Sequence, residues 1–141
     1  MKLLIVTEDN KYLAVGIGND RPEQIMVVDE KYQQSELLLD EIRQMLEQQR
    51  ITVNDLEGIM VVNGPGDFSG LRIGVATANA LAYGLGIRVV GVEMKSTWRK
   101  LAAEEKLEKI WKSGMKTYEK NKMASLNKWV EPEYGREPNI G

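Results

Sequence analysis

Residues 63–74 read Asn-Gly-Pro-Gly-Asp-Phe-Ser-Gly-Leu-Arg-Ile-Gly and carry the densest signal in the chain. The two glycines that flank the proline allow backbone angles and close approaches that other residues cannot make, and the proline stiffens the turn. The aspartate and serine oxygens are placed to cap the first amides of a following helix. These amides and the helix dipole also suit an anion. The candidate residues of the motif are Gly64, Pro65, Gly66, Asp67, Phe68, Ser69, Gly70 and Arg72.

Two interpretations of this motif stay open at the level of sequence. The first is a tight turn from a strand into a helix, and the second is a ligand-binding loop. A Walker A loop is excluded because no Gly-Lys-Ser/Thr follows the glycines. The dinucleotide fingerprint fails because Ser69 stands where its third glycine belongs.

The flanks of the motif predict a strand–helix–strand unit. The β-branched run at 58–63 is typical of a strand that is buried on both faces. A helix is expected over about 70–83, ended by Gly84 and Gly86, and a further strand over 87–93. A unit of this spacing implies a parallel, right-handed crossover.

The N-terminal part predicts three strands and one helix. Apolar runs at 3–7, 12–17 and 24–29 are separated by turn-forming residues and indicate an antiparallel meander. From Ser35, a suitable N-cap, apolar residues recur at helical spacing as far as Leu46. The predicted fold is therefore α/β, with a mixed five-stranded sheet in the order β-β-β-α-β-α-β and a basic helix at the C-terminal end.

Composition excludes several classes of function. The chain has 141 residues, 43% of them hydrophobic, which suits one small globular domain. It has no cysteine and no histidine, so disulfides, thiolate nucleophiles, Ser–His catalysis and the commonest metal ligands are absent. No run approaches the ~18 to 20 apolar residues that a membrane span needs. We expect a soluble, cytoplasmic protein without a metal site.

A shift in charge divides the chain near Glu93. Residues 1–93 contain 8 basic and 14 acidic side chains, whereas residues 94–128 contain 10 basic and 4 acidic ones. We expect a folded lobe at 1–93, a basic amphipathic helix at 94–113 and a poorly ordered extension at 114–141. Removal of residues 114–141 should then leave the lobe folded.

Small residues form two ridges on the helix that is predicted after the motif. Such ridges allow another helix or a sheet to approach at the short end of the usual ~8–10 Å separation. Either both ridges pack within the chain, or one packs on the sheet and the other on a partner. The first ridge consists of Gly70, Gly74, Ala78 and Ala82, and the second of Ala76, Ala80 and Gly84.

The motif resembles the G-P-G-S-F-T-G-L-R-I-G stretch of the TsaB/YeaZ family of tRNA threonylcarbamoyladenosine biosynthesis proteins. The resemblance continues in order across residues 1–93. It implies the N-terminal lobe of an actin-like ATPase (ASKHA, ribonuclease H-like) fold. It also implies a non-catalytic subunit that binds the related TsaD protein, which transfers the threonylcarbamoyl group to adenosine 37 of tRNA.

The chain departs from this family at three places. Thr7 stands where the first strand of the family has an aspartate, and Gln34-Ser35 replaces the His-Ser that opens the first helix. We also expect the second lobe of the family to be missing or to be replaced by the basic extension. Because an actin-like ATPase closes two lobes over its nucleotide, we expect no cofactor, with ATP bound weakly or not at all.

The resemblance also implies a partner surface made by two helices. The partner would be a TsaD-like protein or a second copy of the chain, tRNA would be contacted indirectly, and no membrane would be involved. The predicted interface residues are Ser35, Leu38, Leu39, Ile42, Gly70, Leu71, Gly74, Ala78 and Ala80.

Two alternatives concern catalysis and RNA. Two-metal hydrolysis needs several converging carboxylates. Only Glu8 or Asp9 lies near the end of the first predicted strand, and Asp67 is the only carboxylate in the loop after the strand at 58–63. We therefore expect no hydrolytic activity. The basic C-terminal region either contacts RNA or covers the sheet with its lysines in solvent. The aromatic residues available to stack on bases are Trp98, Trp111, Tyr118 and Trp129.

Overall fold

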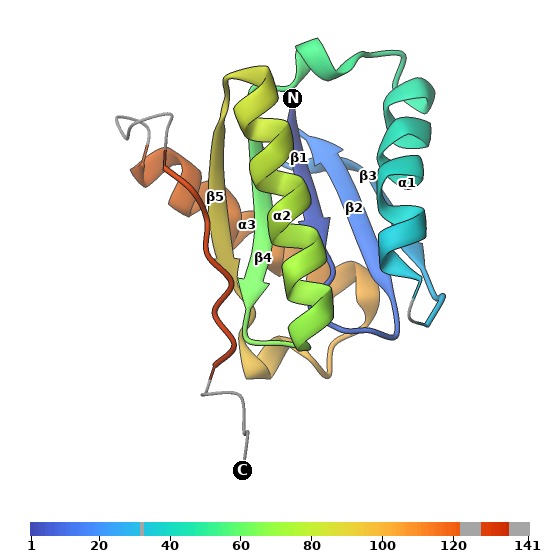
Figure 1. Ribbon diagram of the computed structural model, residues 1–141, viewed down its shortest axis with the longest axis vertical. Coiled ribbons are helices and arrows are strands. Elements are labelled where there is room, and N and C mark those ends of the chain that lie inside the picture. Colours follow the sequence, from blue (N-terminus) through green and yellow to red (C-terminus); the bar gives the residue numbers. More distant parts are fainter. Residues whose placement is uncertain (32, 122–127, 136–141) are drawn as a thin grey trace.

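The computed structural model describes residues 1–31, 33–121 and 128–135, and its elements follow the predicted order (Figure 1). Short 3₁₀ turns lie at Val53–Asp55 and Ser96–Trp98. The predicted β-β-β-α-β-α-β order is confirmed, and the strand ends differ from the predicted ones by a residue or two. The strands and helices are β1 (Lys2–Val6), β2 (Leu13–Gly18), β3 (Pro22–Val28), α1 (Gln34–Gln48), β4 (Gly58–Gly64), α2 (Phe68–Leu85), β5 (Arg88–Glu93) and α3 (Ala103–Lys120).

The sheet is mixed, with the strand order β3-β2-β1-β4-β5. The pairs β1–β2 and β2–β3 are antiparallel, whereas β1–β4 and β4–β5 are parallel. In the central pair, Ile5 of β1 lies beside Val61 of β4. Both strands are buried on both faces, as the unbroken apolar run of β4 predicts. Their carboxyl ends therefore open at the same edge of the sheet.

Helices cover both faces of the sheet (Figure 1). Helices α1 and α2 lie over one face, where Leu38, Met45 and Ala78 pack against Ile5 and Val61. Helix α3 lies over the opposite face. Its apolar side is buried there against β1, β4 and β5. The residues of α3 in this second core are Leu107, Ile110, Trp111 and Tyr118.

The C-terminal region corrects the predicted boundaries. Helix α3 begins at Ala103 and continues to Lys120, past the predicted end at 113. At Gly114 the helix lies close to the sheet. A Cβ at this position would be 2.7 Å from the sulfur of Met60, so the absence of a side chain allows the close approach. The sequence prediction ended the helix at residue 113, directly before this glycine.

Part of the predicted disordered extension is packed against the lobe. We call residues 128–135 the C-terminal strap. The Asn79 side chain donates to the Val130 carbonyl (2.8 Å) and accepts from the Val130 amide (3.0 Å). The Glu133 amide donates to the carbonyl of Asn63 (2.6 Å). The rest of the predicted extension, at 122–127 and 136–141, lies outside the described residues.

The predicted helix caps are also corrected. Ser35 is exposed within α1, and Gln33 takes the N-cap position without a side-chain hydrogen bond. Asp67 does precede α2, but its carboxylate accepts from the Asn10 amide (2.8 Å) instead of a helix amide. Gly86, at φ 67°, ends α2 in the left-handed conformation that favours glycine. None of the helices in the described ranges combines the length and apolarity that crossing a bilayer requires.

Candidate functional site

The glycine-rich motif forms a closed turn at the carboxyl ends of β1 and β4. A Cβ on Gly66 would lie 2.6 Å from the Cβ of Glu8, and one on Gly64 would overlap the Glu133 carbonyl of the strap. The Asp67 amide donates to the Glu8 carbonyl (2.7 Å). Because the chain's own atoms fill the space beside both glycines, the geometry favours the interpretation as a tight turn over that as a ligand loop.

Thr7 occupies the position at which the family resemblance places an aspartate. It is fully buried, and its hydroxyl donates to the carbonyl of Gly70 in the first turn of α2 (2.6 Å). A Cβ on Gly74 would overlap this hydroxyl oxygen. The helix therefore covers the end of β1 at close range, and Thr7 holds it there.

Hydrogen bonds also join the start of α1 to the connection between β1 and β2. Gln34 is 2% exposed, and its side-chain amide donates to the carbonyls of Asp9 (2.7 Å), Tyr12 (2.9 Å) and Thr7 (3.2 Å). The residue that replaces the family's histidine therefore ties α1 to the connection between β1 and β2.

Glu8 is the one buried carboxylate among the described residues at this edge. It is 2% exposed, accepts from the Tyr12 hydroxyl (2.9 Å) and pairs with the Arg99 guanidinium at 3.4 Å. Burial raises the pKa of the Glu8 carboxyl, although Tyr12 and Arg99 oppose the shift. Burial and the nearby Glu8 charge raise the pKa of the Tyr12 phenol.

Arg99 was missed by sequence reasoning. Its guanidinium donates to the Pro65 carbonyl (2.6 Å) as well as contacting Glu8. It thereby links the segment after β5 to both β1 and the motif. No periodicity or motif marks Arg99, because its partners lie 34 and 91 residues away.

The raised pKa of Glu8 predicts a pH dependence of stability. The folded chain binds the Glu8 proton more tightly than the unfolded chain does. The free energy of unfolding should therefore fall as pH rises above the ordinary glutamate pKa of 4.5, by at most about 1.4 kcal/mol per pH unit. Replacing Glu8 by glutamine should flatten this slope in urea unfolding measured from pH 4.5 upward.

Two other carboxylates provide the internal control for this measurement. Side-chain hydrogen bonds from Arg43 and Lys2 lower the pKa of Asp40 and Glu57, respectively, so their contributions change below pH 4.5. A slope above pH 4.5 that persists unchanged in Glu8→Gln would rule out Glu8 as its source.

The carboxylates that were considered for metal-dependent hydrolysis are engaged in local hydrogen bonds. Asp67 accepts from the Asn10 amide, and Asp9 accepts from the Lys11 amide (2.9 Å). Among the described residues, no group of three or more acidic side chains is placed to hold a metal ion. In the described structure, these acids organise the turns that join the strands.

The two small-residue ridges of α2 face opposite ways. Every residue of the first ridge, Gly70 to Ala82, is buried against the sheet, whereas Ala76, Ala80 and Gly84 of the second are exposed. Most of the predicted interface residues are consequently unavailable to a partner. Those buried within the chain are Leu38, Ile42, Gly70, Leu71, Gly74 and Ala78, and those exposed are Ser35, Leu39 and Ala80.

Large apolar side chains are exposed on the same side of the sheet as this ridge. Leu39 on α1 is 59% exposed, and Tyr83 on α2 is 74% exposed. Trp129 of the strap is 61% exposed and stacks on Tyr83 with ring centroids 5.8 Å apart. Sequence reasoning missed this pair, because it placed Trp129 in a disordered tail. We define the helical face as Ser35, Leu39, Ala76, Ala80, Tyr83, Gly84 and Trp129.

The outer end of the motif is exposed beside the strap. Phe68 is 49% exposed and stacks on Tyr134 with centroids 4.4 Å apart, while the Arg72 guanidinium lies 5.6 Å above the Phe68 ring. Ser69 is also exposed. These side chains fasten the strap to the beginning of α2.

The aromatic residues proposed for base stacking are mostly occupied. Trp111 is 1% exposed and Tyr118 is 7% exposed, both within the core beneath α3. The Trp111 indole donates to the Asn19 carbonyl (3.2 Å). Trp98 is half-buried, and Trp129 is stacked on Tyr83. Helix α3 therefore covers the sheet, and most of these rings are not free to stack on bases.

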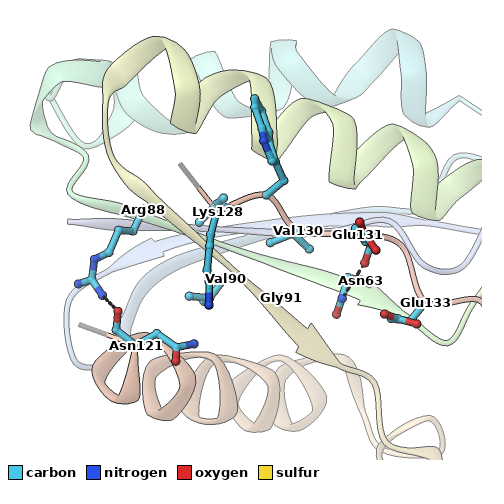
Figure 2. A pocket seen from close by; sticks show the side chains of 11 residues that line it. Asn63, Arg88, Val90, Gly91, Asn121, Lys128, Val130, Glu131 and Glu133 are labelled. Atoms are coloured by element: carbon cyan, nitrogen blue, oxygen red, sulfur yellow. Dashed lines mark hydrogen bonds between the residues drawn. The ribbon is translucent and has the colours of Figure 1, made fainter. Parts of the chain in front are cut away.

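A cleft of about 380 Å³ lies between β5, the end of α3 and the strap (Figure 2). Arg88 and Lys128 lie at one end of it, and Glu131 and Glu133 at the other. The Arg88 guanidinium donates to the carbonyls of Tyr118 (3.1 Å) and Asn121 (2.8 Å). The cleft thus has basic groups beside α3 and acidic groups beside the motif.

The fold and the turn together define a class of protein. A mixed five-stranded sheet with helices on both faces, and a glycine-rich turn where parallel central strands end, is an actin-like (ribonuclease H-like) lobe. Residues 29–119 match the family described as TsaD: tRNA N6-adenosine threonylcarbamoyltransferase, and the chain belongs to this family. The predicted TsaB/YeaZ resemblance is confirmed by the solved structures. YeaZ from Pseudomonas aeruginosa superimposes with a TM-score of 0.61 at 22% identity, covering 65% of this chain.

One of two relatives in sequence carries the same description as this family. A tRNA N6-adenosine threonylcarbamoyltransferase of Geotalea daltonii is 47% identical over 51 residues, or 36% of this chain. An uncharacterized protein of Mycobacterium tuberculosis is 33% identical over 93 residues, or 62% of this chain. The matched regions span only 15% of the Geotalea enzyme, 44% of the mycobacterial protein and 43% of YeaZ.

Proposed function

We propose that the chain is a non-catalytic partner subunit in the cytoplasmic formation of tRNA N6-threonylcarbamoyladenosine, and that it docks its helical face on a TsaD-like protein. The exposed second ridge of α2 carries this proposal. Ala76, Ala80 and Gly84 are small and exposed, so a helix of a partner can pack on them at short axial distance, and the neighbouring Tyr83 is exposed as well. The YeaZ-like fold and the family match support the choice of partner.

The proposed lack of catalysis rests on the chemistry at the strand ends. Thr7 replaces an aspartate and is bonded to the Gly70 carbonyl, and Glu8 is bonded to Tyr12 and Arg99. These groups hold the turn together, which leaves them poorly suited to activate water. By the same argument we propose that ATP is bound weakly or not at all and that tRNA is modified by the partner.

A leucine at Ala80 tests the partner surface. The larger side chain should hold the helix axes apart, with a cost of about 1–3 kcal/mol, so the affinity for a TsaD-like protein of the same host should fall by about 5- to 150-fold. Isothermal titration calorimetry of the purified pair measures this change. The Ala80→Leu chain itself should keep its far-ultraviolet circular dichroism, because Ala80 is exposed.

Ala103→Leu provides a matched control. Ala103 is also an exposed helical alanine, but it begins α3 on the other side of the sheet, so its replacement should leave the affinity unchanged. Equal affinities for wild type and Ala80→Leu would contradict the proposed interface. Light scattering of the chain alone separates the alternative function, in which two copies of this single lobe pair through the same face as a binding module.

A further inference from the structure

Four lysines form a line along the solvent side of α3. They are separated by three, four and four residues, so they fall on one side of a helix and extend over about 16 Å of its axis. All are exposed, while the opposite side of α3 is buried in the core. We call this line the lysine stripe, and its members are Lys109, Lys112, Lys116 and Lys120.

The stripe is a region of net positive charge. The acidic residues of α3 gather mainly in its first turns, at Glu104, Glu105 and Glu108, and only Glu119 accompanies the four lysines further along. Within the described ranges, none of the stripe lysines forms an ion pair, whereas Lys2 and Arg43 elsewhere do. The ammonium groups of the stripe therefore face solvent and remain available to an anionic ligand.

Positive charge continues around the end of the helix. Arg88 donates to the carbonyl of Asn121, directly after Lys120, and Lys128 extends from the strap toward the same place (Figure 2). Both line the cleft of about 380 Å³. The basic surface thus runs from the middle of α3 to the edge of the sheet.

The regular spacing of the lysines indicates the kind of ligand that the surface suits. A regular row of cations suits a polymer with regularly spaced anions, which is the phosphodiester backbone of a nucleic acid. An anionic membrane is disfavoured because the apolar residues that would insert, such as Leu107 and Ile110, are buried against the chain's own sheet. We propose that the lysine stripe binds the phosphate backbone of RNA without reading its sequence. The choice of RNA over DNA rests on the proposed function.

The lysine stripe is separate from the partner surface. The stripe lies on the α3 side of the sheet, and the helical face lies on the α1 and α2 side (Figure 1). The chain can therefore hold RNA and a protein partner at the same time. Ala80→Leu should accordingly leave RNA binding unchanged, so failure of one proposal is distinguishable from failure of the other.

Salt-dependent binding of a fluorescein-labelled tRNA transcript tests the proposal. Four phosphate contacts should make the association constant fall by about 50- to 150-fold between about 50 and 200 mM KCl in fluorescence anisotropy. The triple variant Lys109→Gln, Lys112→Gln, Lys116→Gln should lose about two to three units of the slope of log K against log salt. Its helix should remain folded, since these side chains are exposed.

A second triple variant is the matched control, because it removes three positive charges from lysines outside α3. Lys11, Lys31 and Lys100 are exposed and lie outside α3, so their replacement by glutamine should leave the salt slope unchanged. An equal loss of slope in both triples would show an effect of net charge alone and overturn the proposal. Absence of tRNA binding at 50 mM KCl would overturn it too. So would tighter binding of a DNA duplex of similar length, or of phosphatidylserine vesicles.

Discussion

Replacing Gly74 with leucine is expected to prevent the chain from folding. Gly74 lies where α2 crosses the end of β1, and even a Cβ there would overlap the buried Thr7 hydroxyl oxygen. The whole leucine side chain would have to enter a site between the helix and Ile5, so α2 would be pushed off the sheet. The lost contacts include the bond from Thr7 to Gly70 and the packing of Val75 and Ala78. The overpacking cost of about 1–3 kcal/mol or more adds to the loss of these contacts, and we expect the sum to exceed the total stability, which is about 5 kcal/mol at the low end for a small domain.

Gly84 on the same helix provides the matched control. A Cβ at Gly84 meets nothing within 4 Å, and leucine is a better helix former than glycine by up to about 1 kcal/mol. Gly84→Leu should therefore fold with equal or greater stability, while Gly74→Leu should be recovered as aggregate or should lack a cooperative thermal transition. A cooperative melt of Gly74→Leu within a few degrees of wild type would show that α2 is less tightly seated than the structure indicates.

The order of the elements was predictable because each carries a local signal. The unbroken apolar run of β4 marks a strand buried on both faces, and the spacing of Leu38, Ile42 and Met45 marks the buried side of α1. The existence of two ridges on α2 was likewise visible. Which ridge meets the sheet was not predictable, because both have the same small residues and only the tertiary arrangement distinguishes them.

The sequence-based predictions were wrong where contacts between residues far apart in the sequence determine the structure. The predicted helix ended at residue 113, yet α3 continues through Gly114, where Met60 and Val92 of the sheet approach the helix closely. Residues 128–135 have a composition typical of a disordered tail, yet Asn63 and Asn79 supply hydrogen bonds to their backbone. The contacts of Arg99 with Glu8 and Pro65 are equally non-local. Each of these contacts joins residues that are far apart in the sequence, so local sequence patterns do not indicate them.

A chain that ends at residue 113 is expected to lose most of its stability, contrary to the independent lobe that sequence reasoning predicts. The missing part of α3 contains Tyr118, which is 7% exposed, packs on Gly58 and donates its hydroxyl to the Glu57 carbonyl (2.8 Å). Loss of one buried aromatic side chain costs about 3–5 kcal/mol. Removal of Gly114 and the following turn also exposes Met60 and the end of β5.

A chain that ends at Asn121 separates the contribution of the strap from that of the helix. It keeps α3 but loses the Asn79–Val130 hydrogen bonds and the burial of the Val130 side chain, which is worth about 1.5–3 kcal/mol. Thermal unfolding should therefore rank the chains as full length, then 1–121, then 1–113. The first step should lower Tm by several degrees, and the last chain should show no cooperative transition at 25 °C or above. A cooperative melt of 1–113 close to that of 1–121 would instead show that β1 to β5 form a stable sheet without the last turns of α3.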